Sequence, residues 1–158
     1  MVSCRVRQAS CDSSEAKVKQ RHWKRAEDYR RAELDALIER VKGGDPDAIE
    51  EAVMFTAMES FGNWHGRARA KICRNLKSRT IPGGLQDILV QAISNRLLAG
   101  TFSEQFKDQL AMAIRFRPSE MEHFARQACQ SPKSYIQRYG QWVLHILSTT
   151  NTAERYSG

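Results

Sequence analysis

Apolar residues recur along the chain at intervals of three to four positions, which is the spacing of one face of an α-helix. The stretch PDAIEEAVMFTAMES, which starts at Pro46, shows this spacing in Ile49 and Val53, and PGGLQDILVQAISNRLL repeats it in Leu85 and Leu89. No segment shows a convincing alternation of apolar and polar residues, the pattern of a half-buried β-strand. The hydrophobic pattern therefore predicts an all-α protein.

The helical patterns repeat with a period of 36 residues. Pro46, Pro82 and Pro118 each open an apolar helical pattern, as suits a residue whose missing N–H has no partner in the first turn of a helix. Asp45 directly precedes the first proline and is a good N-cap. Each unit breaks in its middle at residues that can start a second helix, namely Gly62–Asn63, Gly100–Thr101 and Gln130–Ser131. The sequence thus predicts three antiparallel helix pairs, over residues 45–79, 82–116 and 118–148.

The second helices of the three units align in columns spaced four residues apart. These columns are Ala68, Phe106 and Ile136, then Ile72, Leu110 and Gly140, then Leu76, Ile114 and Leu144. Gly140 interrupts an apolar column, and we expect it to mark a close contact between helices. The third unit, whose second helix reads YIQRYGQWVLHIL, best carries a resemblance to the helical repeats of HEAT and armadillo proteins, over roughly residues 44–148. The resemblance implies a short right-handed solenoid, although a helical bundle with the same apolar faces would give similar columns.

The resemblance also implies a role for Arg69, which projects into the apolar half of its helix. In HEAT units an arginine near the start of the second helix commonly makes structural interactions, and the equivalent positions here hold Lys107 and Gln137. A buried guanidinium needs fixed acceptors to offset its desolvation. We therefore expect Arg69 to be structural.

One long helix is predicted before the repeats, over residues 15–42, and it ends at Gly43 and Gly44. Its second half carries an apolar stripe that should pack on the first repeat, whereas its first half is basic and includes Lys17, Arg21, Lys24 and Arg25. Residues 1–14 and 149–158 are rich in polar residues and lack an apolar period, so both are predicted to be flexible tails. The organisation is therefore one helical domain, residues 15–148, between two tails.

The composition is that of a globular protein, and its charge is distributed unevenly along the chain. The 158 residues carry a net charge of +7, with 27% charged and 41% apolar residues. Neither a membrane-spanning run nor the apolar core of a signal peptide is present, so we expect a cytoplasmic protein. Residues 32–60 hold two Lys or Arg against eight Asp or Glu, whereas residues 61–81 hold six Lys or Arg and no acidic residue. The pattern leaves open whether the acidic helix 45–60 masks the basic segment.

The candidate binding site is the segment WHGRARAKICRNLK, residues 64–77. On a helical wheel one half of this segment is apolar, and the other half holds Arg67, Lys71, Arg74 and Lys77. Such a row of cations is either a solvated face or a surface that binds a row of acidic groups.

A second set of basic residues occupies equivalent positions in the three units. If the units stack, Lys77, Arg115 and His145 align as a ladder, which Arg79 and Arg117 continue. Four aromatic residues, Trp64, Tyr135, Tyr139 and Trp142, would add stacking surfaces to a polyanion groove where they are exposed. In helices of this kind, however, aromatic side chains more often belong to the core.

No residue pattern predicts catalysis, a metal or a cofactor. His65 and Cys73 are separated by about 12 Å along a helix, which is too far for a nucleophile and its base. The turn that follows Ile81 lacks the Lys-Ser/Thr of a phosphate-binding loop. The four cysteines are Cys4, Cys11, Cys73 and Cys129. The first two lack the spacing of a zinc site, and the last two fall within apolar patterns, where we expect them in the core.

These observations favour a non-enzymatic binding module, a subunit or adaptor of a larger assembly that docks an acidic protein through its basic helical face. The alternative is a sequence-independent nucleic-acid-binding protein, or a small subunit of a nucleoprotein complex, whose basic side chains contact the phosphate backbone. An amphipathic membrane-surface protein fits less well, because the basic half of the helix 15–42 lacks a broad apolar face.

Overall fold

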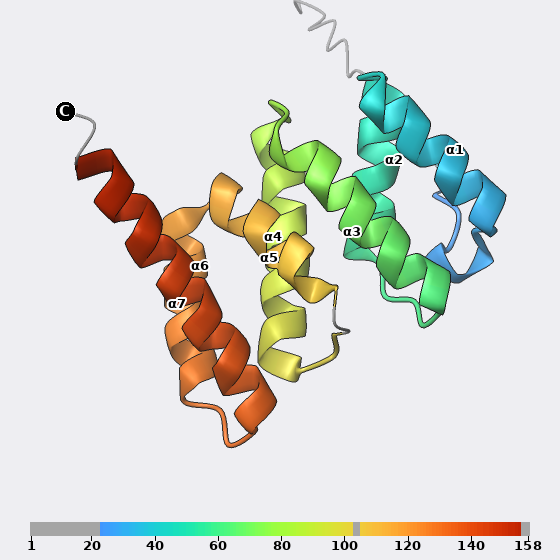
Figure 1. Ribbon diagram of the computed structural model, residues 1–158. Helices are drawn as coiled ribbons and strands as arrows, with labels where there is room; N and C mark the ends of the chain where they lie inside the picture. The colour runs from blue at the N-terminus through green and yellow to red at the C-terminus, as the bar shows by residue number, and fades with distance from the viewer. Residues whose placement is uncertain (1–22, 103–104, 156–158) are drawn as a thin grey trace, which may run out of the picture.

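Seven α-helices and one short 3₁₀ turn form the described part of the computed structural model, residues 23–102 and 105–155 (Figure 1). In chain order these are the turn η1 Ala26–Asp28, then α1 Arg31–Lys42, α2 Pro46–Ala57, α3 Asn63–Lys77, α4 Gly83–Ala99, α5 Phe106–Phe116, α6 Pro118–Cys129 and α7 Ser134–Arg155. No β-strand occurs in these two ranges. The predicted all-α class is confirmed.

The helices form two layers (Figure 1). In one layer α1 contacts α3, α3 contacts α5, and α5 contacts α7; in the other, α2 contacts α4 and α4 contacts α6. Further contacts join the layers, and those between α6 and α7 are the most extensive. The core lies between the layers and includes Phe55, Leu89 and Leu110, none of which is accessible to solvent.

The start of α2 follows from its sequence. The side chain of Asp45 accepts a hydrogen bond from the backbone N–H of Asp47 at 3.0 Å, and Pro46 occupies the first helical position. Gly44, with φ of +81°, lets the chain leave α1 in the left-handed conformation that other residues adopt rarely. The predicted N-cap is confirmed.

The predicted long helix over residues 15–42 is confirmed from Arg31 to Lys42 and is wrong over residues 23–30, which hold only the turn η1. The α-helix begins at Arg31, because the chain before it turns to bury Ala26 and Tyr29. The Tyr29 hydroxyl donates a hydrogen bond to Glu51 of α2 at 2.8 Å, and the backbone N–H of Arg30 donates to the Glu33 carboxylate at 2.8 Å. The bond to Glu51 is a tertiary contact, which overrides a helical propensity that is weak by comparison, whereas the bond to Glu33 caps the first turn of α1 locally. Residues 15–22, and the predicted tail 1–14, lie outside the described residues.

The prediction of a flexible tail over residues 149–158 is also wrong as far as Arg155, because α7 continues to that residue. Hydroxyl groups of its last turns donate to carbonyl oxygens three or four residues back, as Thr150 and Thr152 do to Ile146 and Ser148. Such bonds can form within a helix. The helix therefore continues although every side chain from Ser148 to Arg155 is exposed. Residues 156–158 lie outside the described part.

Gly140 marks a close approach of α7 to α6, as the sequence predicts. A Cβ atom at this position would lie 2.8 Å from the Ala125 carbonyl oxygen and 2.9 Å from the Ala128 Cβ. The absence of a side chain therefore allows the two backbones to approach each other.

Candidate functional site

The helix α3 is amphipathic, as its sequence predicts. Ala68, Ile72 and Leu76 are buried against the neighbouring helices. The four predicted cations on the opposite side, Arg67, Lys71, Arg74 and Lys77, are all exposed. The basic residues therefore form one face of α3 that solvent reaches.

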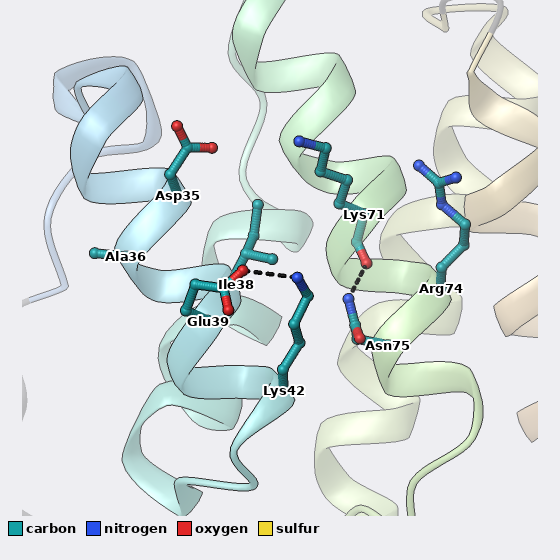
Figure 2. A pocket seen from close by; sticks show the side chains of 8 residues that line it. All are labelled: Asp35, Ala36, Ile38, Glu39, Lys42, Lys71, Arg74 and Asn75. Atoms are coloured by element: carbon teal, nitrogen blue, oxygen red, sulfur yellow. Dashed lines mark hydrogen bonds and ion pairs between the residues drawn. The ribbon is translucent and has the colours of Figure 1, made fainter.

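A groove of about 600 Å³ runs between this face and α1 (Figure 2). Lys71, Arg74 and Asn75 of α3 line one wall, and the carboxylates of Asp35 and Glu39 line the other. Ile38 lies between them and forms part of the apolar floor. The amide of Asn75 donates to the Lys71 carbonyl oxygen at 2.8 Å, so this side chain is held against its own helix. The groove thus offers two walls of opposite charge above an apolar floor.

Trp64 lies at one end of the groove, in an adjoining cavity of about 220 Å³. The indole is 45% exposed. The guanidinium of Arg31 lies 3.8 Å from its ring centroid, and that of Arg67 lies 5.6 Å from it. Trp64 is therefore a surface residue and not part of the core.

The other three aromatic residues differ in their exposure. Tyr135 is 40% exposed, whereas Tyr139 and Trp142 are partly buried and pack against the core. Lys107 lies 5.5 Å from the Trp142 ring centroid. The sequence could not predict which of the four aromatic side chains are exposed, because each lies on a helix that has both a buried and an exposed face.

Intramolecular ion pairs neutralise part of the groove. The Glu39 carboxylate lies 2.7 Å from the Lys42 ammonium on its own helix, and the Arg31 guanidinium lies 4.0 Å from Asp35. Arg74 pairs with Asp108 of α5 at 3.8 Å. Lys71, by contrast, extends from the middle of α3 into the groove (Figure 2). The basic face is therefore moderated by nearby carboxylates and is not a continuous cationic surface.

The carboxylates that line this groove come from α1, whereas the sequence directed attention to the acidic segment 45–60. Asp45 and Glu51 of that segment are instead within 2.9 and 3.3 Å of Arg40 on α1. The hydrogen bond from Arg40 holds the pKa of the Asp45 carboxyl below its ordinary value. Both carboxylates thus join α2 to α1.

The predicted ladder divides into two groups. Lys77, Arg115 and His145 are exposed on α3, α5 and α7, which contact one another in that order. Arg79 donates to the Lys42 carbonyl oxygen, and Arg117 pairs with Asp87 at 2.9 Å. The last two guanidiniums are therefore engaged in contacts within the chain, which limits their predicted role as binding cations. Alignment of the first three stays a prediction.

The second basic cluster is described only in part. The Lys24 ammonium lies 2.8 Å from the Glu33 carboxylate, and Arg25 is exposed beside Glu27 at 3.9 Å. Lys24 therefore helps to hold the start of α1. Lys17 and Arg21 lie outside the described residues.

Two buried arginines form the most unusual polar feature of the described core. Arg69 is 5% exposed and Arg96 of α4 is 7% exposed. Arg69 donates to the Met58 carbonyl oxygen and to Ser60 Oγ, both at 2.6 Å, so its predicted structural role is confirmed. Sequence reasoning missed Arg96, although it follows Leu89 by seven residues and Ile93 by three, which places it on the buried face of its helix.

Cys73 is fully buried, as predicted, and burial raises the pKa of its thiol to about 12. Cys129 is only partly buried, so the prediction that it lies in the core is wrong. In the described part of the chain, no group of three or more His, Cys, Asp or Glu is arranged to hold a metal ion. Among the same residues, no helix has both the length and the apolar character needed to cross a membrane.

Comparison with models of protein families, with the sequences of characterised proteins and with solved structures found no significant match.

Proposed function

We propose that this protein is a non-enzymatic binding module of the HEAT-like type, and that it docks an acidic protein partner through the groove between α1 and α3. Each helix from α1 to α5 contacts the next helix but one along the chain, and this pattern supports a short solenoid of helix pairs. In this proposal the exposed basic face of α3 attracts the partner, and the apolar floor around Ile38 contributes contact area.

The observation that carries the proposal is the composition of the groove. Lys71 of α3 extends toward α1, where Asp35 and Glu39 line the opposite wall across a partly apolar surface. A phosphate backbone would approach both carboxylates, which disfavours a uniform polyanion. A protein segment with acidic, apolar and basic side chains can complement both walls.

Nucleic-acid binding is the second candidate, and exposed Trp64 favours it, because a base can stack on an indole. Arg31 already covers one face of that ring at 3.8 Å, so a base would have to use the other face or displace this guanidinium. This requirement places the nucleic-acid function second.

A binding experiment with matched charge variants separates the two functions. The test variant is Arg67→Gln/Lys71→Gln/Lys77→Gln, and the control is Lys133→Gln/Arg138→Gln/Arg155→Gln, which removes the same charge from exposed positions on and beside α7. Both are compared with the wild type in titrations with a labelled acidic peptide of glutamate, leucine and lysine residues and with single- and double-stranded DNA and RNA, after thermal unfolding has confirmed that all three fold.

We expect the mixed acidic peptide to bind the wild type and the control, and to bind the test variant about tenfold more weakly, because three exposed ion pairs contribute roughly 0.5 kcal/mol each. Equal weakening in both variants would show that only net charge matters and would contradict the proposal. Preferential binding of nucleic acid, with a salt slope that falls by about one for each lost phosphate contact, would establish the second function instead.

A further inference from the structure

A second cleft, distinct from the groove, lies between the segment that follows α2 and the segment that follows α4. Its volume is about 620 Å³, and it is bordered by residues 59–63, 66 and 67 and by residues 100–102, 105, 106 and 109. Arg69 and Arg96 both line it. A cleft of this size falls within the range of small-molecule sites.

The two guanidiniums share the carbonyl groups at the end of α2. Arg96 donates from Nη2 to the Ala57 and Met58 oxygens, both at 3.0 Å, and Arg69 donates from Nη2 to the same Met58 oxygen at 2.6 Å. The C-terminus of a helix carries partial negative charge, so these contacts partly stabilise the two cations. They also hold both guanidiniums at the wall of one cleft.

Hydrogen-bonding capacity remains beyond these contacts. Arg69 also donates to Ser60, and Arg96 donates to Gln109 Oε1 at 3.0 Å. A guanidinium has five N–H groups, and the bonds described occupy about three on each side chain. The Nε of Arg69 is buried and has no hydrogen-bond partner among the described residues.

Their charges are incompletely balanced within the described residues, where no carboxylate oxygen lies within 4.0 Å of either guanidinium. Among the described residues that line the cleft, the other charged groups are Glu59, which is exposed, and Arg67 at the rim. Burial, and then the charge of Arg96, lower the pKa of Arg69 to about 10. A bound anion would relieve both the desolvation and the mutual repulsion.

The cleft also has an apolar part. Phe61 is 89% exposed at its border, and Phe102 stacks on buried Phe106 with ring centroids 4.6 Å apart. A flat apolar group can lie against these rings while an oxyanion attached to it reaches the guanidiniums. Neither half of the cleft alone would select such a molecule.

We propose that this cleft binds a carboxylate carried on an aromatic group. The carboxylate accepts hydrogen bonds from Arg69 and Arg96, and the ring packs between Phe61 and Phe102. The same chemistry is available from a free aromatic acid and from a peptide chain that ends in phenylalanine. The site shares Arg67, at its rim, with the basic face of the first proposal, but neither Arg69 nor Arg96 lines the groove between α1 and α3, so either proposal can fail alone.

The test is a titration of the ¹⁵N-labelled full chain with benzoate, followed through the arginine Nε–Hε signals. Benzamide serves as the neutral analogue, acetate as the anion without a ring, and inorganic phosphate as the anion of a different shape. N-acetylphenylalanine and its amide distinguish a chain end from a free acid.

We expect benzoate to shift the Arg69 and Arg96 signals saturably in the millimolar range, with benzamide and acetate at least about tenfold weaker. Arg96→Lys should weaken benzoate binding by about tenfold, because lysine lacks the planar fork. Phe61→Ser should weaken benzoate but not acetate, and this exposed position carries no risk to the fold. The control Lys71→Gln/Lys77→Gln, which changes the other site, should bind benzoate as the wild type does.

Three results would overturn the proposal. The first is equal response to benzoate and benzamide, and the second is a shift spread evenly over exposed arginines. The third is unchanged benzoate affinity in Phe61→Ser, which decides the question even if Arg96→Lys does not fold. Stronger binding of N-acetylphenylalanine than of benzoate would identify a peptide end as the ligand, and the reverse order a free acid.

Discussion

Gly140 shows how a single residue sets the distance between two helices. The backbone of α6 occupies the space into which a Cβ would project, at 2.8 Å from the Ala125 oxygen. A contact with a backbone atom can be relieved only by moving a helix, whereas a contact with a flexible side chain can be relieved locally. The extensive contact between α6 and α7 therefore depends on the absence of a side chain at Gly140.

We predict that Gly140→Ala lowers the free energy of unfolding by roughly 1 to 2 kcal/mol, because overpacking outweighs the helix propensity gained. Gly84→Ala is the matched control, since no atom lies within 4 Å of a Cβ at that position in the first turn of α4. Urea unfolding should show the control to be as stable as the wild type or more stable. A Gly140→Ala protein of unchanged stability would mean that α7 is free to move away from α6.

The buried thiol of Cys73 gives a second prediction at this scale. Because burial raises its pKa to about 12 and excludes solvent, the thiolate is absent in the folded protein at mildly alkaline pH. In a variant whose other three cysteines are serine, a thiol reagent should label Cys73 no faster than the protein unfolds. Rapid labelling under native conditions, at a rate independent of stability, would contradict this burial.

At the scale of elements, the ends of α1 depend on ion pairs that are exposed to solvent. Lys24 and the backbone N–H of Arg30 bind the Glu33 carboxylate at the first turn, and Arg40 binds Asp45 beyond the last turn. The Lys24 hydrogen bond is the main cause that lowers the pKa of Glu33. These charges therefore stabilise the folded state only while they remain ionised.

The Glu33 carboxylate should make the stability of the folded state decrease as the pH is lowered. The folded pKa of Glu33 lies below its ordinary value of 4.5, so its contribution is present above that pH and is lost as the pH falls through the lowered value. We predict a drop in the melting temperature as the pH falls below about 4.5, and a smaller drop in Glu33→Gln. Lys24→Met should act in the same direction. An identical pH profile in all three proteins would show that Glu33 makes no contribution.

The helix boundaries illustrate which elements can be read from sequence. Helices α2 and α6 begin at Pro46 and Pro118, as the proline spacing predicts, and α4 begins one residue after Pro82. Strong local signals are present there, in proline, the Asp45 cap and glycine. The predicted start of α1 was wrong because it depends on the burial of Tyr29 and its hydrogen bond to Glu51. The predicted end of α7 was wrong because hydroxyl groups of its last turns bond to carbonyl oxygens within the helix.

At the scale of the whole molecule, the layered contacts imply a gradient of stability. Helix α1 contacts mainly α2 and α3, whereas α4 contacts α2, α5, α6 and α7. Where elements contact only their neighbours, those at the edge open more easily than those in the middle. The surface proposed to bind a partner then belongs to the end of the described structure that opens more easily.

Native-state hydrogen exchange tests this gradient. We predict that amides of Leu37 and Ile38 in α1 open with a free energy about 1 kcal/mol or more below that of Ile93 and Leu97 in α4. The difference should vanish as denaturant approaches the unfolding midpoint, which provides an internal control. Identical opening free energies without denaturant would instead indicate a single cooperative unit.

The sequence by itself determined the all-α class, the approximate spans of α2 to α6 and the division of α3 into a buried and a basic half. These properties depend on residues within a few positions of one another, so the periodicity of a helix is enough to predict them. Only the tertiary structure decided which cations remain available. Arg74, Arg79 and Arg117 look alike in sequence, yet their partners Asp108, Lys42 and Asp87 lie about 30 residues or more away along the chain. The shared bonds of Arg69 and Arg96 to the Met58 carbonyl oxygen also required side chains of α3 and α4 to reach the end of α2, an arrangement that no local pattern encodes.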